Sequence, residues 1–401
     1  MTPPVAPLIL PSAIEARLLV ALKTVLPGGR SWPLHEPMFV GNEGAYVKEC
    51  IDTGWVSSVG KFVDEFESRL AQVTGSRHAV ATVNGTAALH VALKLAGVQP
   101  GDEVLVPALS FVATANAVSQ CGAIPHFVDS EMATLGVDPC ALRDYLSFIS
   151  EVSNGTVRNK NTGRKLAALV PMHAFGHPVD LDGLLGVAVD FRIPLVEDAA
   201  ESLGSYYQGQ HTGTFGLLGA LSFNGNKIIT TGGGGAILTQ DADLARYAKH
   251  LTTTAKVAHR WEFFHDEVAY NYRMPNLNAA LGCAQLERLD EFIDSKRVLA
   301  ARYQAAFADD PDMGFVAEPA RCRGNYWLNT ILLAEPSVTV RDALLTAAND
   351  AGFMARPAWS LLNLLPMYVT SPAAPLPVAE RLASGIINLP SSPSIAMGQR
   401  V

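Results

Sequence analysis

One lysine, Lys227, lies in an unusual stretch of sequence, LSFNGNKIITTGGGGAIL, at residues 221–238. An Asn-Gly-Asn turn leads into it, and four consecutive glycines follow it closely. A lysine held in a crowded, partly desolvated pocket becomes a nucleophilic amine. Ser222, five residues earlier, lies at the end of an expected strand, where its hydroxyl can hold a phosphate. A flexible loop is the alternative reading of the glycines, which otherwise let backbone approach a ligand closely.

A carboxylate, Asp198, ends a second apolar strand in the segment VEDAAES. A carboxylate buried against the middle of a sheet needs a cationic partner. Glu197 precedes it directly, and successive side chains of a strand point to opposite faces. We therefore expect only one of the two carboxylates to face a ligand.

Two further features follow predicted strands. In NGTAAL, Gly85 and Thr86 would place backbone N–H groups and a hydroxyl at a helix N-terminus, which is a ready anion site. A simple cap is an equally good reading of that turn taken alone. Phe111 follows the strand that ends at Pro107. An aromatic ring there could stack on a flat ligand, although packing in the core is the commoner use of such a residue.

Together these residues match the needs of one cofactor, pyridoxal phosphate. It requires a lysine for a Schiff base, an acid to keep its pyridine nitrogen protonated, an anion cradle and a flat surface against its ring. The chain offers a candidate for each need, in the order cradle, aromatic, acid, serine and lysine. The joint pattern is more specific than any of its parts.

The elements that must position these residues alternate between strands and helices. Apolar strands are expected at residues 79–83, 103–107, 124–129, 166–173, 193–198, 220–223 and 235–239. This rhythm predicts an α/β domain with a large, mostly parallel sheet and helices on both faces. Ligands of such sheets lie at the carboxyl ends of the strands.

Three parts are expected along the chain. Residues 1–33 form an N-terminal extension with an amphipathic helix at 13–25, residues 34–250 the large α/β domain, and residues 251–401 a smaller α+β domain. Helical spacing covers residues 42–74, and one long helical pattern, with room for a bend, covers residues 276–307.

Composition and charge exclude several classes of protein. The net charge of −8 argues against nucleic acid or an anionic membrane as partner. The five cysteines form no CxxC pair, so neither a metal site nor a disulfide framework is predicted. No signal peptide and no apolar run near the ~18 residues of a membrane span are present. We expect a cytoplasmic protein.

The motifs as a set resemble the DegT/DnrJ/EryC1/StrS sugar-nucleotide aminotransferases, and most of all the LegC-type enzymes of that family. The resemblance runs from about His35 to Pro393 and rests on NGTAALHVAL, PALSFVATANAV, HAFGHPVDLD, VEDAAESLGS, LSFNGNKIITTGGGG and YNYRMPNLNAALGCAQLE. It implies fold type I, the fold of aspartate aminotransferase, with pyridoxal phosphate as cofactor. A related branch has histidine in place of the lysine and dehydrates sugars, which Lys227 argues against.

The resemblance also implies roles for single residues. Lys227 would form the Schiff base and move the proton, Asp198 would pair with the pyridinium, and Phe111 would stack on the ring. Gly85, Thr86 and Ser222 would hold the phosphate. Glu201, which stands where many members have Gln, would lie near an oxygen of the cofactor.

For substrate and partner, the resemblance implies a ping-pong reaction in a homodimer with shared active sites. Asn271 would reach the phosphate of the neighbouring subunit, and His173, Tyr326 and Trp327 would lie near the nucleotide sugar. The amino donor would be L-glutamate, and the acceptor a 4-keto-6-deoxy-N-acetylhexosamine linked to UDP rather than GDP. Legionaminic-acid and bacillosamine-type routes share this step.

Two alternatives stay open at this point. One is a non-catalytic regulator or binding protein that keeps the cofactor as a structural ligand. The other is a fold type I enzyme that acts on an amino acid alone and binds its α-carboxylate through an arginine of the small domain. Arg356 lies in that part of the chain, but glutamate must also be held in the favoured reading.

Overall fold

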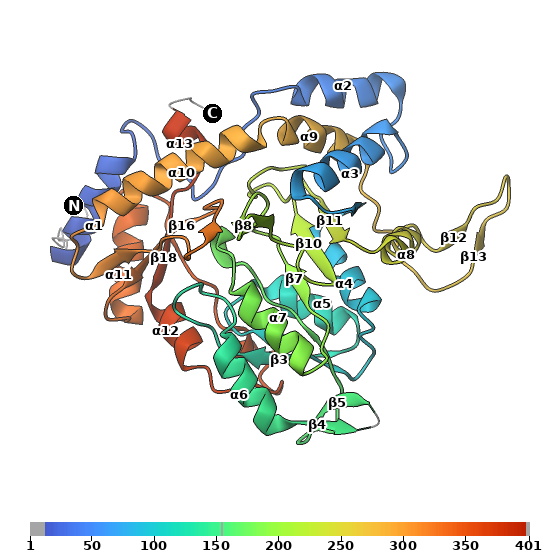
Figure 1. Ribbon diagram of the computed structural model, residues 1–401. Helices are drawn as coiled ribbons and strands as arrows, with labels where there is room; N and C mark the ends of the chain where they lie inside the picture. The colour runs from blue at the N-terminus through green and yellow to red at the C-terminus, as the bar shows by residue number, and fades with distance from the viewer. Residues whose placement is uncertain (1–12, 154, 398–401) are drawn as a thin grey trace, which may run out of the picture.

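A mixed sheet of seven strands forms the centre of the molecule (Figure 1). The computed structural model describes residues 13–153 and 155–397. Isolated bridges between Leu169 and Leu195, and between Met172 and Asp198, join a three-stranded and a four-stranded ladder. In spatial order the strands are β3 (Ile124–Val128), β2 (Glu103–Pro107), β6 (Leu166–Leu169), β7 (Val196–Asp198), β10 (Leu218–Ser222), β11 (Gly235–Thr239) and β1 (His78–Thr82). All neighbours up to β10 run parallel, whereas β11 is antiparallel to both of its neighbours.

Helices cover both faces of this sheet, because each strand is apolar on both sides. Val104 and Val106 of β2 pack toward one face and Leu105 toward the other, as strand alternation requires. One face carries α4 (Gly85–Leu95), α5 (Val112–Gln120) and α8 (Ala242–Thr252). The other carries α3 (Lys61–Thr74), α6 (Pro139–Ile149), α7 (Leu181–Asp190) and α9 (Asn276–Leu286). The predicted fold class is confirmed.

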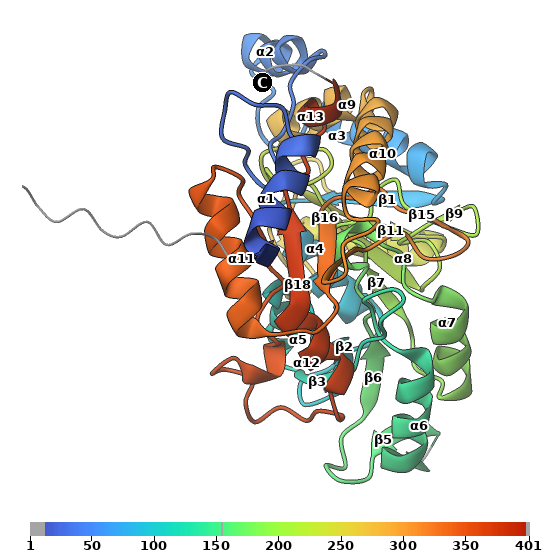
Figure 2. The same ribbon diagram turned by 90° about the vertical axis from the view of Figure 1, so that its left-hand side faces the viewer.

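The C-terminal part has its own antiparallel sheet and core. The sheet has the order β14 (Met313–Phe315), β16 (Asn329–Leu333), β18 (Ile386–Leu389) and β17 (Arg356–Pro357). Around it lie α10 (Leu289–Ala306), α11 (Val338–Asp350), α12 (Pro377–Gly385), α13 (Ser394–Met397) and the 3-10 helix η2 (Leu362–Leu364). Helix α1 (Ala13–Val25) buries Leu18 and Leu22 in the same core, beside α10 and α11 (Figures 1 and 2). The expected domain boundaries stay predictions, and residues 1–12 of the expected extension lie outside the described residues.

Two long helical patterns of the sequence are each divided into two helices. Gly54, with a left-handed φ of 74°, ends α2 (Glu43–Thr53) before α3 begins. A Cβ on Gly60 would lie 2.3 Å from the amide carbon of Asn276, so the loop between the helices passes directly over the start of α9. The pattern at 276–307 breaks between α9 and α10, at Glu287 and Arg288.

The remaining elements are short. They are the 3-10 helix η1 (Ala174–Gly176), the hairpin of β4 (Ser150–Ser153) and β5 (Thr156–Asn159), the small sheet of β15 (Cys322–Arg323), β8 (Tyr206–Tyr207) and β9 (Gln210–His211), and the projecting hairpin of β12 (Lys256–Val257) and β13 (Phe264–His265) (Figure 1). Within residues 13–153 and 155–397, no helix combines the length and the apolar character that crossing a membrane would require.

Candidate active site

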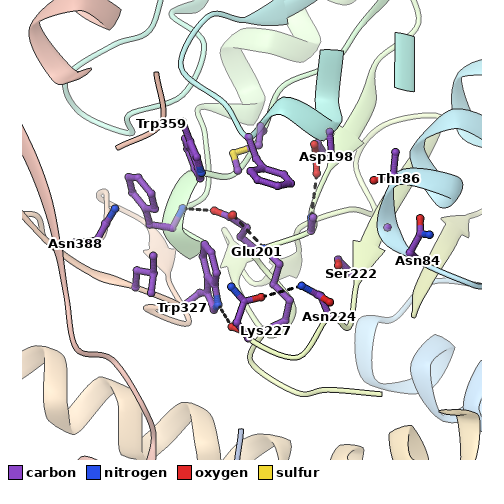
Figure 3. A pocket seen from close by; sticks show the side chains of 18 of the residues that line it. Asn84, Thr86, Asp198, Glu201, Ser222, Asn224, Lys227, Trp327, Trp359 and Asn388 are labelled. Atoms are coloured by element: carbon purple, nitrogen blue, oxygen red, sulfur yellow. Dashed lines mark hydrogen bonds and ion pairs between the residues drawn. The ribbon is translucent and has the colours of Figure 1, made fainter. Parts of the chain in front are cut away.

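A cavity of about 490 Å³ opens where β7 and β10 end and α4 begins. The C-terminal part supplies its other wall (Figure 3). The lining residues are Leu34, Asn84, Gly85, Thr86, Leu89, Phe111, Ala113, Met172, Phe175, Asp198, Ala200, Glu201, Ser222, Asn224, Asn226, Lys227, Gly234, Trp327, Leu328, Arg356, Pro357, Trp359 and Asn388. The cavity thus brings together Lys227, Asp198, Glu201, Ser222, Gly85, Thr86, Phe111 and Trp327 from the sequence-based set.

The amine of Lys227 is held between a carboxylate and an aromatic ring. The Asn-Gly-Asn turn is closed by a hydrogen bond of 3.0 Å from the Lys227 N–H to the carbonyl of Asn224. The side chain enters the cavity, where Nζ lies 3.1 Å from Glu201 Oε1 and 3.8 Å from the centre of the Trp327 ring. The indole N–H of Trp327 donates to the Asn226 carbonyl at 2.6 Å, so the turn fixes the ring as well as the lysine.

Asp198 reaches the cavity because β7 pairs in parallel with β10, where Ala220 is its partner. Its Oδ2 accepts a hydrogen bond of 2.7 Å from the hydroxyl of Thr114, and its Oδ1 accepts one of 3.2 Å from the N–H of Ala200. Both donors are neutral. Burial raises the pKa of Asp198 despite these bonds and the charge of Lys227 nearby. A cation bound next to this carboxylate would therefore be stabilised.

Glu197 points to the opposite face of β7, as the alternation predicted. Its carboxylate accepts hydrogen bonds from the backbone N–H groups of Gly213, Phe215 and Gly216 at 2.7–2.8 Å. His173 completes the set through Nε2 at 3.1 Å. Burial alone would raise the pKa of Glu197. The hydrogen bonds have the larger effect, so the pKa is lowered below its ordinary value.

Two of the residues expected near the nucleotide sugar lie outside the cavity. His173 has no exposed surface, since its Nδ1 accepts from the Val179 N–H and its Nε2 faces Glu197. Tyr326 is turned toward Glu318, whose N–H donates to the phenol oxygen. The structure corrects both placements, because each ring is enclosed by protein. Asn271 is exposed and does not line the cavity of its own chain.

The expected anion cradle lies at the start of α4. The Asn84 side chain caps the helix by accepting from the Ala87 N–H at 2.8 Å, and the amides of Gly85 and Thr86 have no partner within the helix. A Cβ on Gly85 would lie 2.8 Å from the Cβ of Ser222, so only glycine lets the helix approach the strand this closely. A Cβ on Gly235 would likewise lie 2.5 Å from the backbone of Asn84.

Glu201 is fixed from both sides. Its Oε1 faces Lys227, and its Oε2 accepts the N–H of Phe175 at 2.9 Å. Phe175 has a φ of 57°, a left-handed conformation that costs a non-glycine residue about 1–3 kcal/mol. Its ring stacks on Trp359, with centroids 4.9 Å apart. Burial raises the pKa of Glu201 to about 7, although the charge of Lys227 opposes the change.

These residues fit pyridoxal phosphate on the observed geometry. Lys227 supplies the amine, and Asp198 is a buried carboxylate that still lacks a cationic hydrogen-bond partner. The helix start with Gly85 and Ser222 leaves donors for a phosphate. Phe111, half exposed at the start of α5, lines the same space.

Several residues of the site were not anticipated from the sequence. Thr114, which holds Asp198 without lining the cavity, has a local signal, since it follows Phe111 by three residues at the start of a helix. Asn84 directly precedes Gly85, and Met172 and Phe175 follow strand β6, whereas Leu34, Trp359 and Asn388 reach the cavity from elsewhere in the chain. Asn84 could have been found as the cap of α4.

Residues 39–400 match the DegT/DnrJ/EryC1/StrS aminotransferase family. The chain belongs to this family. It is therefore a pyridoxal-phosphate-dependent aminotransferase of fold type I, which confirms the predicted family, activity and cofactor.

Relatives in sequence and in structure agree with this membership. The chain is 37% identical over 361 residues to the GDP-perosamine synthase of Caulobacter vibrioides, covering 88% of this chain and 91% of the relative. It is 36% identical over 367 or 368 residues to the GDP-perosamine synthases of Escherichia coli O157:H7 and Vibrio cholerae, each match covering 92% of this chain and 95% of the relative. The crystal structure of the aminotransferase TlmJ from Streptoalloteichus hindustanus superposes with a TM-score of 0.80 at 29% identity, covering 90% of this chain and 93% of that one.

Proposed function

We propose that this aminotransferase moves the amino group of L-glutamate to the C4 ketone of a nucleotide-linked 4-keto-6-deoxyhexose, giving a 4-amino sugar. The observation that carries the proposal is the free volume beside Lys227. The cradle with Asn84, Thr86 and Ser222 occupies one side of the cavity, Trp327, Trp359 and Asn388 line the other, and the amine of Lys227 lies between them, against the Trp327 ring (Figure 3). Aromatic faces with a few polar groups suit a sugar ring and its linked nucleotide.

The names of the relatives favour GDP as the nucleotide. Three of them are GDP-perosamine synthases, which by name make a GDP-linked amino sugar. We therefore rank GDP first. The UDP-linked N-acetyl sugar implied by the resemblance to the LegC-type enzymes is the second candidate.

In this proposal each residue has a defined task. Pyridoxal phosphate, when bound, supplies an aldehyde for the amine and a ring that draws electrons from the reacting carbon. Asp198 would balance the charge of the ring nitrogen, and Gly85, Thr86 and Ser222 would hold the phosphate. Lys227 would take a proton from the substrate carbon and return it at the next position. Phe111 would lie against the ring.

A shared site in a homodimer is part of the proposal. Asn271 is exposed and outside the cavity of its own chain, so it would act on the cavity of a second copy. Sedimentation of the purified protein measures this, and a monomer at working concentration would contradict it.

An enzyme that acts on amino acids alone would need a free guanidinium for the α-carboxylate. Arg356 lines the cavity, but its Nη1 donates to Asn349 and to the Ala355 carbonyl at 3.3 and 3.2 Å. Because the glutamate carboxylate must also be held in the sugar-nucleotide reading, Arg356 does not separate the two readings.

The test is to incubate the protein with glutamate and, separately, with GDP- and UDP-linked 4-keto-6-deoxy sugars. We expect an aminated sugar, identified by mass spectrometry and NMR, with the GDP-linked substrate converted faster. Lys227→Ala should give no product and no visible absorbance of bound cofactor, with an unchanged circular dichroism spectrum. Amination by Lys227→Ala, or conversion of amino acids and keto acids without any aminated sugar, would contradict the proposal.

A further inference from the structure

When Lys227 is a free amine, two groups that attract a cation lie next to it. Glu201 lies 3.1 Å from Nζ, and the face of Trp327 lies 3.8 Å from it, a distance at which a ring attracts a cation. In the proposed reaction, however, the free amine must take a proton from carbon, which an ammonium group cannot do. The proton on the amine therefore needs an acceptor within reach.

Glu201 is the side chain positioned to accept it. The Phe175 N–H anchors Oε2 at 2.9 Å and leaves Oε1 toward the lysine. The Asn325 side chain holds the Glu201 backbone carbonyl at 2.9 Å, so the residue is fixed at both ends. Asp198 also faces this space, but its hydrogen bonds come from Thr114 and Ala200.

The groups that face Glu201 set its proton affinity. The charged ones are Lys227, from the turn after β10, and Asp198, from the end of β7. The η1 helix contributes a backbone amide only, and Trp327 does not titrate. Burial lowers the pKa of His35 well below its ordinary value, and the charges of Lys296 and Lys227 lower it further, so this imidazole carries no charge toward Glu201.

We propose that Glu201 is a second acid–base residue of the reaction, which takes a proton from the ammonium group of free Lys227 and later returns it. In this step one N–H bond of Lys227 breaks and one O–H bond forms on Glu201 Oε1. An ion pair becomes a neutral pair, and no proton enters from solvent. The inference rests on the proposed function, because it concerns the stage at which Lys227 is a free amine.

Burial supports the exchange energetically. In water a lysine and a glutamate differ by about 6 pKa units, which makes the neutral pair rare. Burial raises the pKa of Glu201 from 4.5 to about 7, so part of that difference is removed on the carboxylate side. Glu201 is 4% exposed, and solvent therefore competes little for the proton.

The kinetic test follows a single half-reaction with glutamate from the absorbance of the bound cofactor. Between about pH 7 and pH 9, where Glu201 is increasingly a carboxylate, the rate constant of the wild type should change by less than about threefold. Glu201→Gln cannot accept the proton, so Lys227 must lose it to solvent, and the rate constant should rise about 100-fold over the same range. Glu201→Asp keeps a carboxyl group and should restore the flat profile at a lower rate.

A second readout does not depend on turnover. In protein loaded with pyridoxamine phosphate, Lys227 is free, and the infrared band of a protonated carboxyl group should titrate near pH 7. Glu201→Gln should lack that band, whereas Lys227→Ala should keep it and shift its titration to higher pH, because the cation that favours the carboxylate is gone.

The outcomes separate the two proposals. A wild type that does not respond to glutamate contradicts the proposed function. A wild type that responds, but whose pH profile matches that of Glu201→Gln, overturns the inference about Glu201. An infrared band that persists in Glu201→Gln, or that titrates near the ordinary value of about 4.3, overturns it independently.

Discussion

Two neighbouring carboxylates at the end of strand β7 lie on opposite faces of the sheet, and their pKa values are shifted in opposite directions. Glu197 and Asp198 are both buried, with 0% and 6% of their surface exposed. Glu197 receives four hydrogen bonds, three of them from backbone amides, and its pKa is lowered in spite of burial. Asp198 receives two, and burial raises its pKa. The supply of donors, rather than burial, therefore separates a structural carboxylate from one kept ready for a ligand.

The largest expected effect is on the cavity face. Asp198→Asn keeps the size of the side chain but removes the charge opposite the ring nitrogen, so kcat/KM should fall about 10³-fold. The free energy of unfolding should change little or rise at pH 7, because a desolvated charge is lost. Steady-state kinetics and urea unfolding of the same preparation measure both. A stable Asp198→Asn variant with wild-type kcat/KM would contradict the role of the Asp198 charge in the reaction.

On the buried face the expected effect is on stability. Glu197→Gln places an NH₂ group against backbone donors, which should lower the free energy of unfolding by about 3 kcal/mol at pH 7. The pKa of Glu197 is depressed in the folded state, so its contribution is present above the unfolded value and is lost as pH falls through the folded one. The difference between wild type and variant should therefore shrink in acid, as urea unfolding at several pH values would reveal. Equal stability at pH 7 would contradict the structural role.

A smaller effect is expected for Glu201, which shares the cavity face with Asp198. Its pKa rises from 4.5 to about 7 on folding, so the stability it contributes is full below about pH 4.5 and is lost as pH rises through 7. Relative to the wild type, Glu201→Gln should gain about 2 kcal/mol between pH 4.5 and pH 6. Thermal unfolding of the cofactor-free protein measures this. A gain in stability that appears below pH 4.5 instead would mean that folding lowers the pKa of Glu201, as it lowers that of Glu197.

Much of this site could be predicted from the positions at which the expected strands end. Lys227 and Asp198 were predicted because residues at the carboxyl ends of neighbouring parallel strands converge, and the pairing of Asp198 with Ala220 realises that rule. The alternation that separates Glu197 from Asp198 also holds one strand away. Met172, the bridge partner of Asp198, lines the cavity, while His173 faces Glu197. Applied there, the same rule would have excluded His173.

The other half of the cavity could not be predicted in this way. Trp359 and Asn388 come from the C-terminal sheet and its loops, and no period in the sequence relates them to Lys227. Tyr326 and Trp327 are adjacent, yet only the tryptophan reaches the cavity, because Tyr326 has a left-handed φ of 49° that turns the chain between them. Such placements depend on long-range packing of the two parts.

Helix α1 has a consequence for the order of folding. Its buried Leu18 and Leu22 share a core with Ile387 and Leu389 of β18. All strands of the cofactor-binding sheet lie between α1 and β18 in the sequence. Contacts so distant along the chain close late, because the intervening loop must first be ordered. During translation α1 must therefore wait, with its apolar stripe uncovered, until α10 and α11 have left the ribosome. A chain stalled before α10 would present this stripe to chaperones, although the sheet that carries Lys227 and Asp198 is already complete.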